Sequence, residues 1–183
     1  MTVKKWNARL SLLTILLLLI HEGYQLFAYI TFYYNPVLSK VSGYALAGCF
    51  VLHAILSMIG VAFLHDGKSV AYKKLNIRTV LQRVSAVLLI LLLPLHIFSF
   101  PLLKSSAGGF GYFLVEAAQI IFYAALFCHV ATSFSNALIT LGWLSDIKKK
   151  RIIDVVVIVI CVIMLIAICV IIPATHIKIF GQG

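Results

Sequence analysis

Acidic residues are scarce in this chain, and charged residues of either sign are few. The 183 residues include five Asp and Glu against 15 Lys and Arg, and only 11% are charged whereas 63% are hydrophobic. An ordinary soluble domain carries about 25% charged residues, so this composition excludes that class. The net charge of +10 would suit a nucleic-acid-binding protein. However, the basic residues cluster between hydrophobic runs, as topology signals do, and we expect no nucleic-acid partner.

Paired cysteine motifs are also missing. The sequence has no C-x-x-C pair and no C-x-x-C-H motif, which excludes covalent attachment of a c-type haem. The four cysteines all fall within apolar runs, where they are expected to pack as small hydrophobic residues; they are Cys49, Cys128, Cys161 and Cys169.

Long apolar runs make up most of the sequence. An α-helix needs about 20 apolar residues to cross a bilayer core. We therefore expect an all-α membrane protein, a five-helix transmembrane bundle with one domain over residues 1–183. Its helices should cover roughly residues 10–33, 44–64, 79–100, 110–144 and 153–172. Asn35-Pro36 and Pro173 are expected to end the first and fifth helices, and the polar segments in between to be loops. The basic N-terminus imitates a signal peptide but lacks a small-residue cleavage site, so the first helix is expected to be retained.

The distribution of Lys and Arg predicts the orientation. Twelve of them lie in the N-terminal segment and in the second and fourth loops, against three (Lys40, Lys104 and Lys178) in the alternate loops and the tail. The positive-inside rule then places the N-terminus in the cytoplasm and the C-terminus outside. We expect a multi-pass protein of the cytoplasmic (inner) membrane, surrounded by lipid.

Each of the first four apolar segments carries one histidine: His21, His53, His96 and His129. A lone imidazole inside a membrane helix is costly and is by default a candidate functional group. Imidazole suits iron, and two facing histidines can hold a b-type haem without covalent attachment. Alternatively, the four imidazoles could form hydrogen bonds between helices. Predicted depth pairs His21 with His96 toward the outer face and His53 with His129 toward the cytoplasm.

The other two histidines, His65 and His176, border predicted loops and are expected at the surface or the membrane interface. Carboxylates and thiolates do not gather at the depth of the four helix-borne histidines, so a zinc or copper site is not indicated.

With the histidines in place, the chain resembles a known family. It is similar over its whole length to the five-helix, di-haem cytochrome b anchor of succinate:quinone oxidoreductases, which include succinate:menaquinone reductases and quinol:fumarate reductases. The resemblance rests on the four histidines, a fifth helix without one, and the VLQRVSA entry to the third helix. That entry is similar to the family's Gln-Arg-x-Ser/Thr-Gly element, with Ala86 in place of glycine. The R-L-S-L-L run from Arg9 and the His53-Ala54 pair are further similarities.

The resemblance implies two haem b groups enclosed by four helices. His21 and His96 would ligate the distal haem iron, and His53 and His129 the proximal one. It also implies a flavoprotein and an iron–sulfur subunit on the cytoplasmic face. The chain would be the quinone-reactive subunit of a succinate dehydrogenase or fumarate reductase complex. Electrons would pass between the iron–sulfur partner and a quinone, expected to be menaquinone, while a partner carries out the dicarboxylate chemistry.

Two acids are further candidates. Glu22 adjoins His21, and Glu116 lies in the fourth helix; either could relay protons to a quinone, with Gln25 or Gln119 as hydrogen-bond partners. Both acids could equally serve as interfacial or interhelical hydrogen-bonding groups.

The second pair of candidates lies at the cytoplasmic entry to the third helix. Arg83 and Ser85 are candidates for contacting a haem propionate there, whereas Arg78 is expected to snorkel to the interface.

Two other functions stay open. One is a cytochrome b anchor for a different quinone-linked dehydrogenase or reductase. The other is a haem-free, proton-coupled transporter or scaffold that uses the histidines and Glu22 for protons.

Overall fold

The computed structural model describes residues 2–62, 73–105 and 109–180. Its helices are α1 (Val3–Thr31), α2 (Pro36–Ala62), α3 (Lys73–Ile97), α4 (Ser99–Ser105), α5 (Phe110–Leu141) and α6 (Ile147–Phe180). The described ranges contain no strand. Five of these helices, all except α4, are long and apolar enough to cross a membrane. The all-α, multi-pass membrane protein expected from the sequence is confirmed at this level.

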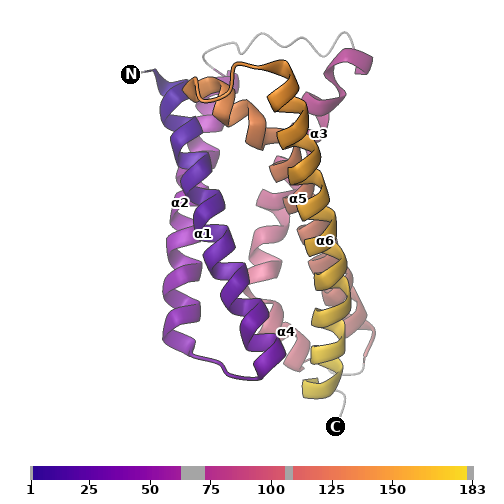
Figure 1. Cartoon of the computed structure of the whole chain (residues 1–183). Helices are drawn as coiled ribbons and strands as arrows, with labels where there is room; N and C mark the ends of the chain where they lie inside the picture. Colours follow the sequence, from indigo (N-terminus) through magenta and orange to yellow (C-terminus); the bar gives the residue numbers. More distant parts are fainter. Residues whose placement is uncertain (1, 63–72, 106–108, 181–183) are drawn as a thin grey trace. The chain divides into compact units, whose positions relative to one another are not determined.

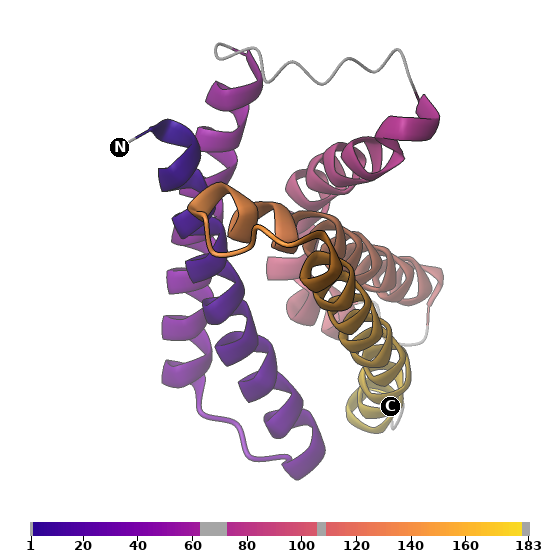
Figure 2. The same ribbon diagram turned by 45° about the horizontal axis from the view of Figure 1, so that its top comes forward.

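The chain divides into two compact units, which are described one at a time. Unit one consists of residues 1–69 and 134–153, and unit two of residues 70–133 and 154–183. In unit one, α1 and α2 pack side by side and run in opposite directions, as Figure 1 and the turned view in Figure 2 both show. Unit two contains α3, α4 and most of α5 and α6. His65 and the rest of the predicted second loop up to residue 72 lie outside the described residues.

The start of α2 is set by Asn35 and Pro36. Asn35 Oδ1 accepts the backbone N–H groups of residues 37 and 38 at 3.0 and 3.2 Å. Pro36 takes the first helical position, where its missing N–H has no intrahelical partner to lose. The helix therefore begins eight residues before the predicted start at Tyr44. The prediction of a loop over residues 37–43 is wrong. It rested on the polar residues in this stretch and did not take into account the helix cap formed by Asn35.

The predicted third helix is interrupted near its end. α3 begins at Lys73 rather than at Thr79, contains Pro94, and ends at Ile97. The short helix α4 follows at once, and the predicted loop from Pro101 onward is wrong where it overlaps this helix. The connection stays hydrogen-bonded, since Phe98 N–H donates to the Pro94 carbonyl at 3.0 Å.

The turn between α5 and α6 is fixed by two capping residues. Gly142 has φ 80°, a conformation that favours glycine. Its N–H donates to the Ile139 carbonyl, and the Trp143 N–H donates to the Leu138 carbonyl, both at 3.0 Å. This is the Schellman pattern of helix termination. Asp146 then caps α6, because its Oδ1 accepts the Lys148 N–H at 2.6 Å.

The helix α6 does not stop at Pro173. It continues to Phe180, so the predicted end at Ile172 is wrong. Proline removes one backbone hydrogen bond, but an unwound chain would leave many more carbonyl and amide groups unsatisfied in an apolar medium. The predicted start at Ile153 is wrong as well, since α6 begins at Ile147 and carries Asp154 within its second turn.

Candidate functional site

In unit one, His21 on α1 is held by a chain of hydrogen bonds from α2. Its Nδ1 lies 3.0 Å from Ser42 Oγ. Ser42 is buried and gives its own hydroxyl hydrogen to the Ser39 carbonyl at 3.1 Å. With the hydroxyl hydrogen assigned to the Ser39 carbonyl, the Ser42 oxygen accepts from His21, and the imidazole proton is assigned to Nδ1. In the neutral ring, Nε2 then carries a lone pair that can bind a metal.

The close approach of this ring to α2 depends on Gly43. A Cβ at this position would lie 3.2 Å from His21 Cε1 and 3.7 Å from Nδ1. The first distance is shorter than most packing contacts of a Cβ atom, so a larger residue at this position would require the ring to shift by a few tenths of an ångström. Gln25 is a predicted quinone contact. Its Nε2 instead donates to Ser39 Oγ at 2.7 Å, so Ser39 is hydrogen-bonded to both Gln25 and Ser42.

In unit two, His96 on α3 is held by Gln119 of α5. Its Nδ1 lies 2.9 Å from Gln119 Oε1, while Gln119 Nε2 donates to the Leu95 carbonyl at 3.3 Å. The Leu95 contact assigns the amide orientation, so the oxygen faces the histidine and Nδ1 must donate. The ring also stacks on Phe122, with centroids 4.3 Å apart and planes 13° from parallel. Gln119, predicted as a quinone contact, therefore orients His96.

His129 on α5 is oriented in the same way by α3. Its Nδ1 lies 3.0 Å from the Gln82 carbonyl, which can only accept. The proton is again on Nδ1, and Nε2 has the lone pair. Ser85 Oγ lies 3.3 Å from the same nitrogen and donates to the Leu81 carbonyl at 2.7 Å. Its predicted contact with a haem propionate stays a prediction, and would require this hydroxyl to turn away from Leu81.

The structure shows where the other predicted site residues lie, and their roles stay predictions. His53 is half-buried on α2, Glu22 is buried on α1, and Arg83 is exposed on α3. Each predicted haem pair takes one histidine from each unit, so the pairings themselves stay predictions.

A polar clamp in unit two was missed by sequence reasoning. Arg78 of α3 forms a two-pronged ion pair with Asp154 of α6, with N···O distances of 2.7 and 2.8 Å. Its Nε also donates to the Thr132 carbonyl of α5 at 2.8 Å. The side chains are 31% and 17% exposed. The expectation that Arg78 snorkels to the interface is wrong, because its guanidinium group is held by Asp154 and by a backbone carbonyl of α5.

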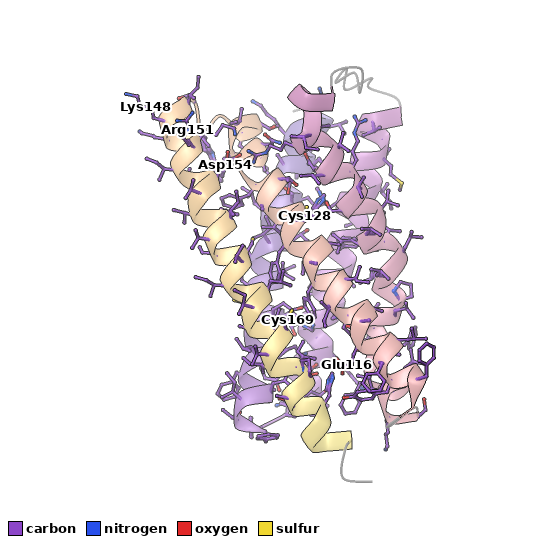
Figure 3. The ribbon with its side chains drawn as sticks, turned by 90° about the vertical axis from the view of Figure 1, so that its right-hand side faces the viewer. Glu116, Cys128, Lys148, Arg151, Asp154 and Cys169 are labelled. Carbon is purple, nitrogen blue, oxygen red and sulfur yellow. The ribbon has the colours of Figure 1, made fainter. Side chains whose placement is uncertain are left out.

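The second missed pair consists of Glu116 on α5 and His176 on α6. Glu116 Oε1 and His176 Nδ1 are hydrogen-bonded, and the two residues are only 8% and 3% exposed. Figure 3 shows Glu116 near the end of α6 that carries Cys169, far along the helix from Asp154. The expected surface or interfacial place of His176 is wrong, since α6 continues through Pro173 and keeps the ring buried within unit two.

Comparisons of the chain with protein-family models, with curated proteins and with solved structures found no match. The family resemblance therefore rests on the sequence pattern alone.

Proposed function

We propose that the chain is a di-haem cytochrome b subunit that passes electrons between a cytoplasmic iron–sulfur partner and a membrane quinone. The observation that carries the proposal is that three histidines of the apolar helices each engage a hydrogen-bond partner through Nδ1. In His21, His96 and His129, Nδ1 donates to a hydroxyl, an amide oxygen and a carbonyl, respectively. Each neutral ring thus has its lone pair on Nε2.

This arrangement is typical of metal-binding histidines. A ligating imidazole almost always donates its other N–H to a carbonyl, carboxylate or similar acceptor, which fixes the tautomer and raises the basicity of the ligating nitrogen. A purely structural hydrogen bond between helices would account for any one of these three contacts. It gives no reason for Nδ1 to be the donor in all three histidines, which lie on different helices. The donor set therefore fits an iron macrocycle, which would supply one-electron chemistry when bound.

The proposed ligand pairs are His21 with His96 and His53 with His129, following the predicted depths in the membrane. The basic segments, which include Lys148 to Arg151, would face the cytoplasm and an iron–sulfur subunit with its flavoprotein. Such a complex would be a succinate:menaquinone reductase or a quinol:fumarate reductase, with the dicarboxylate chemistry on the partner. Arg83 is the candidate for a haem propionate, and Glu22 or Glu116 for proton transfer to the quinone.

The test is a reduced-minus-oxidised optical spectrum of the purified full-length chain, with haem quantified as the pyridine haemochrome. We expect about two b haems per chain. His96→Ala and His129→Ala should each lose one of them, whereas His65→Ala, a histidine of the predicted polar loop, should keep both. A folded wild-type chain without haem would end the proposal.

A second function is favoured by the buried Glu116–His176 pair. Ionisable pairs inside membrane helices often mark proton pathways, as in a proton-coupled transporter. Proton flux into vesicles that contain the haem-free chain, abolished by Glu116→Gln, would support this alternative. If haem is present, the remaining question is which reductase the chain serves, and the neighbouring coding sequences would identify the partner.

A further inference from the structure

The helices α3 and α5 of unit two are joined by polar contacts along one seam. The contacts are His96 with Gln119, the Gln82 carbonyl with His129, and Arg78 with the Thr132 carbonyl. Their order along α3 is the reverse of their order along α5, as in an antiparallel helix pair. The first two orient histidines that the proposed function uses as haem ligands. The contact of Arg78 has no task in that function.

The Arg78 contact lies about one helical turn from the contact that orients His129. Arg78 precedes Gln82 by four residues on α3, which is about 6 Å along the axis. Thr132 follows His129 by three residues on α5, which is about 4.5 Å. The two contacts run in opposite directions, since α3 donates to α5 at Arg78 and α5 donates to α3 at His129. A rotation or slide of α5 on α3 that breaks one contact would therefore lengthen the other.

The direction of the Arg78 side chain is fixed by α6. Its guanidinium group forms two hydrogen bonds to Asp154, at 2.7 and 2.8 Å. Its Nη2 and Nε also donate to the carbonyls of Ala131 and Thr132, at 3.3 and 2.8 Å. The planar guanidinium presents its N–H groups in a rigid fork, so a group held along one edge has its other donors set in direction. Asp154 thus holds the arginine in the geometry that meets α5.

Both charged residues lie in helices that are long and apolar enough to cross a membrane, and Arg78 is the second residue of the span Ile77–Ile97. Figure 3 shows Asp154 toward the same end of unit two as Cys128 of α5, away from Glu116. Ionisable side chains in such spans are costly and are by default candidate functional groups. Well-packed apolar residues often stabilise a helix contact as well as an ion pair does. Stability alone is therefore a weak reason for a charged pair at this place.

The turn of α5 that Arg78 holds has side chains bonded to its own backbone. The Thr132 hydroxyl lies 2.8 Å from the Cys128 carbonyl and 3.1 Å from the His129 carbonyl. The Ser133 hydroxyl donates to the His129 carbonyl at 2.6 Å. Such bonds to the preceding turn often bend a helix, and a bend here would redirect the His129 side chain. The carbonyls that Arg78 engages belong to the same turn, so its hydrogen bonds tie this turn to α3.

We infer that Arg78, fixed by Asp154, is a positioning residue for His129, and this inference rests on the proposed function. Arg78 holds the turn of α5 after His129 against α3, so that Nδ1 meets the Gln82 carbonyl and Nε2 keeps the direction that a ligand needs. The helix α6 has no proposed haem ligand, and it takes part in the site through this contact. His96, farther along the seam, has its own acceptor and does not need Arg78.

The first measurement needs no haem. The full-length chain, labelled with ¹⁵N-histidine and kept haem-free in detergent, gives ring-nitrogen NMR signals that distinguish the two neutral tautomers. His129→Gln identifies the signals of His129, which should be in the Nδ1–H form in the wild type. Arg78→Met should give a mixture of tautomers, because the ring loses its fixed contact with the Gln82 carbonyl. Lys104→Met removes an exposed cation from the same unit and should match the wild type.

A double variant separates positioning from stability. Arg78→Met combined with Asp154→Leu removes both charges, and it should be more stable than either single variant. It still lacks a donor for the α5 carbonyls, so the tautomers of His129 should stay mixed. If Arg78→Met fails to fold, the double variant supplies the same measurement. Arg78→Lys keeps the charge and a donor without the rigid fork, and it should restore part of the Nδ1–H form.

The second measurement follows the loss of haem to an excess of apomyoglobin. The His96→Ala background should keep only the haem of the predicted pair that includes His129. There, Arg78→Met should speed haem loss about 10- to 100-fold and shift the midpoint potential, as the loss of an outer partner of a metal ligand does. The His129→Ala background should keep only the other haem, and the same substitution should leave its rate of loss and its potential unchanged.

The outcomes separate the inference from the proposed function. The pure Nδ1–H form of His129 in both Arg78→Met and the double variant overturns the inference and leaves the cytochrome function standing. A wild type whose His129 is not in this form overturns it too. Equal acceleration of haem loss in the two backgrounds also overturns it, since that result indicates a general loss of structure. A wild type that binds no haem ends the cytochrome proposal, whereas a His129 tautomer that still depends on Arg78 supports the positioning role.

Discussion

At the scale of single residues, the orientation of His21 depends on the missing side chain of Gly43. Gly43→Ala should lower haem content by up to one haem per chain, because the new methyl group would lie 3.2 Å from His21 Cε1 and displace the ring. Haem is measured as the pyridine haemochrome. Stability should hardly fall, since Ala is favoured over Gly in a helix by about 0.5–1 kcal/mol.

The matched control for this substitution is Gly48→Ala in the same helix. A Cβ at Gly48 would meet no atom within 4 Å. This variant should gain about 0.5–1 kcal/mol of stability and keep its haem. Equal haem content in the two variants would contradict the role given to Gly43.

The acceptor for His96 can be tested at the same scale. Gln119→Leu removes the oxygen that accepts the Nδ1 proton and leaves a buried N–H unpaired, at a cost of about 1–3 kcal/mol. Loss of such a partner typically lowers metal affinity 10- to 100-fold. We expect faster haem loss to an excess of apomyoglobin, together with a shifted midpoint potential. Gln119→Glu restores an acceptor and should retain haem better than the leucine variant, a difference that simple loss of packing would not produce.

At the scale of helices, Arg78 and Asp154 connect three elements of unit two. Asp154→Ala leaves the guanidinium partly buried beside the carbonyls of α5 and should destabilise the chain by about 1–3 kcal/mol, less than a fully buried pair because both side chains are partly exposed. Unfolding in detergent measures the effect.

A double-mutant cycle supplies the control for this clamp. The pair Arg78→Met and Asp154→Leu removes both charges, and it should be more stable than either single variant. Strict additivity of the two single substitutions would show that the ion pair contributes nothing.

The course of α6 through Pro173 gives a second prediction for a helix. Because the residues on both sides are already helical, Pro173→Ala should stabilise the chain by up to about 3 kcal/mol in thermal unfolding. A loss of stability would indicate that the helix ends at the proline after all.

The helices themselves could be predicted from the sequence, but their ends could not. Apolar run length is a strong signal, and it located all five long helices. The ends depend on single caps such as Asn35, Gly142 and Asp146, and on the ability of α6 to continue through Pro173. The second of these errors hid a contact, because a helix that stops at Ile172 leaves out His176, the partner of Glu116. The four candidate haem ligands could be picked out from the sequence because each is the one histidine in its apolar segment, whereas hydrogen-bond acceptors such as Ser42 and Gln119 needed coordinates.

At the scale of the whole molecule, the orientation in the membrane is open to a direct test. The distribution of Lys and Arg predicts a cytoplasmic N-terminus and an outer C-terminus. Green fluorescent protein should fluoresce when fused to the N-terminus, and alkaline phosphatase should be active when fused to the C-terminus. The reversed pattern would place the proposed iron–sulfur partner on the wrong face of the membrane.

Haem should also act as a stabilising ligand of the entire chain. A ligand present at about 1,000 times its dissociation constant adds about 4 kcal/mol to the folded state. Thermal unfolding of the loaded chain should therefore occur at a higher temperature than that of the haem-free chain in the same detergent. The double variant His96→Ala, His129→Ala should show no such difference.

The hydrogen bonds to the histidines have one more consequence, which concerns assembly. Ser42 belongs to the same unit as His21, and Gln119 and Gln82 belong to the same unit as His96 and His129. Each of these imidazoles is therefore oriented by neighbours in its own unit. Under the proposed function, insertion into the membrane would come first and haem loading second, and no proton on these rings would have to move when the haem enters.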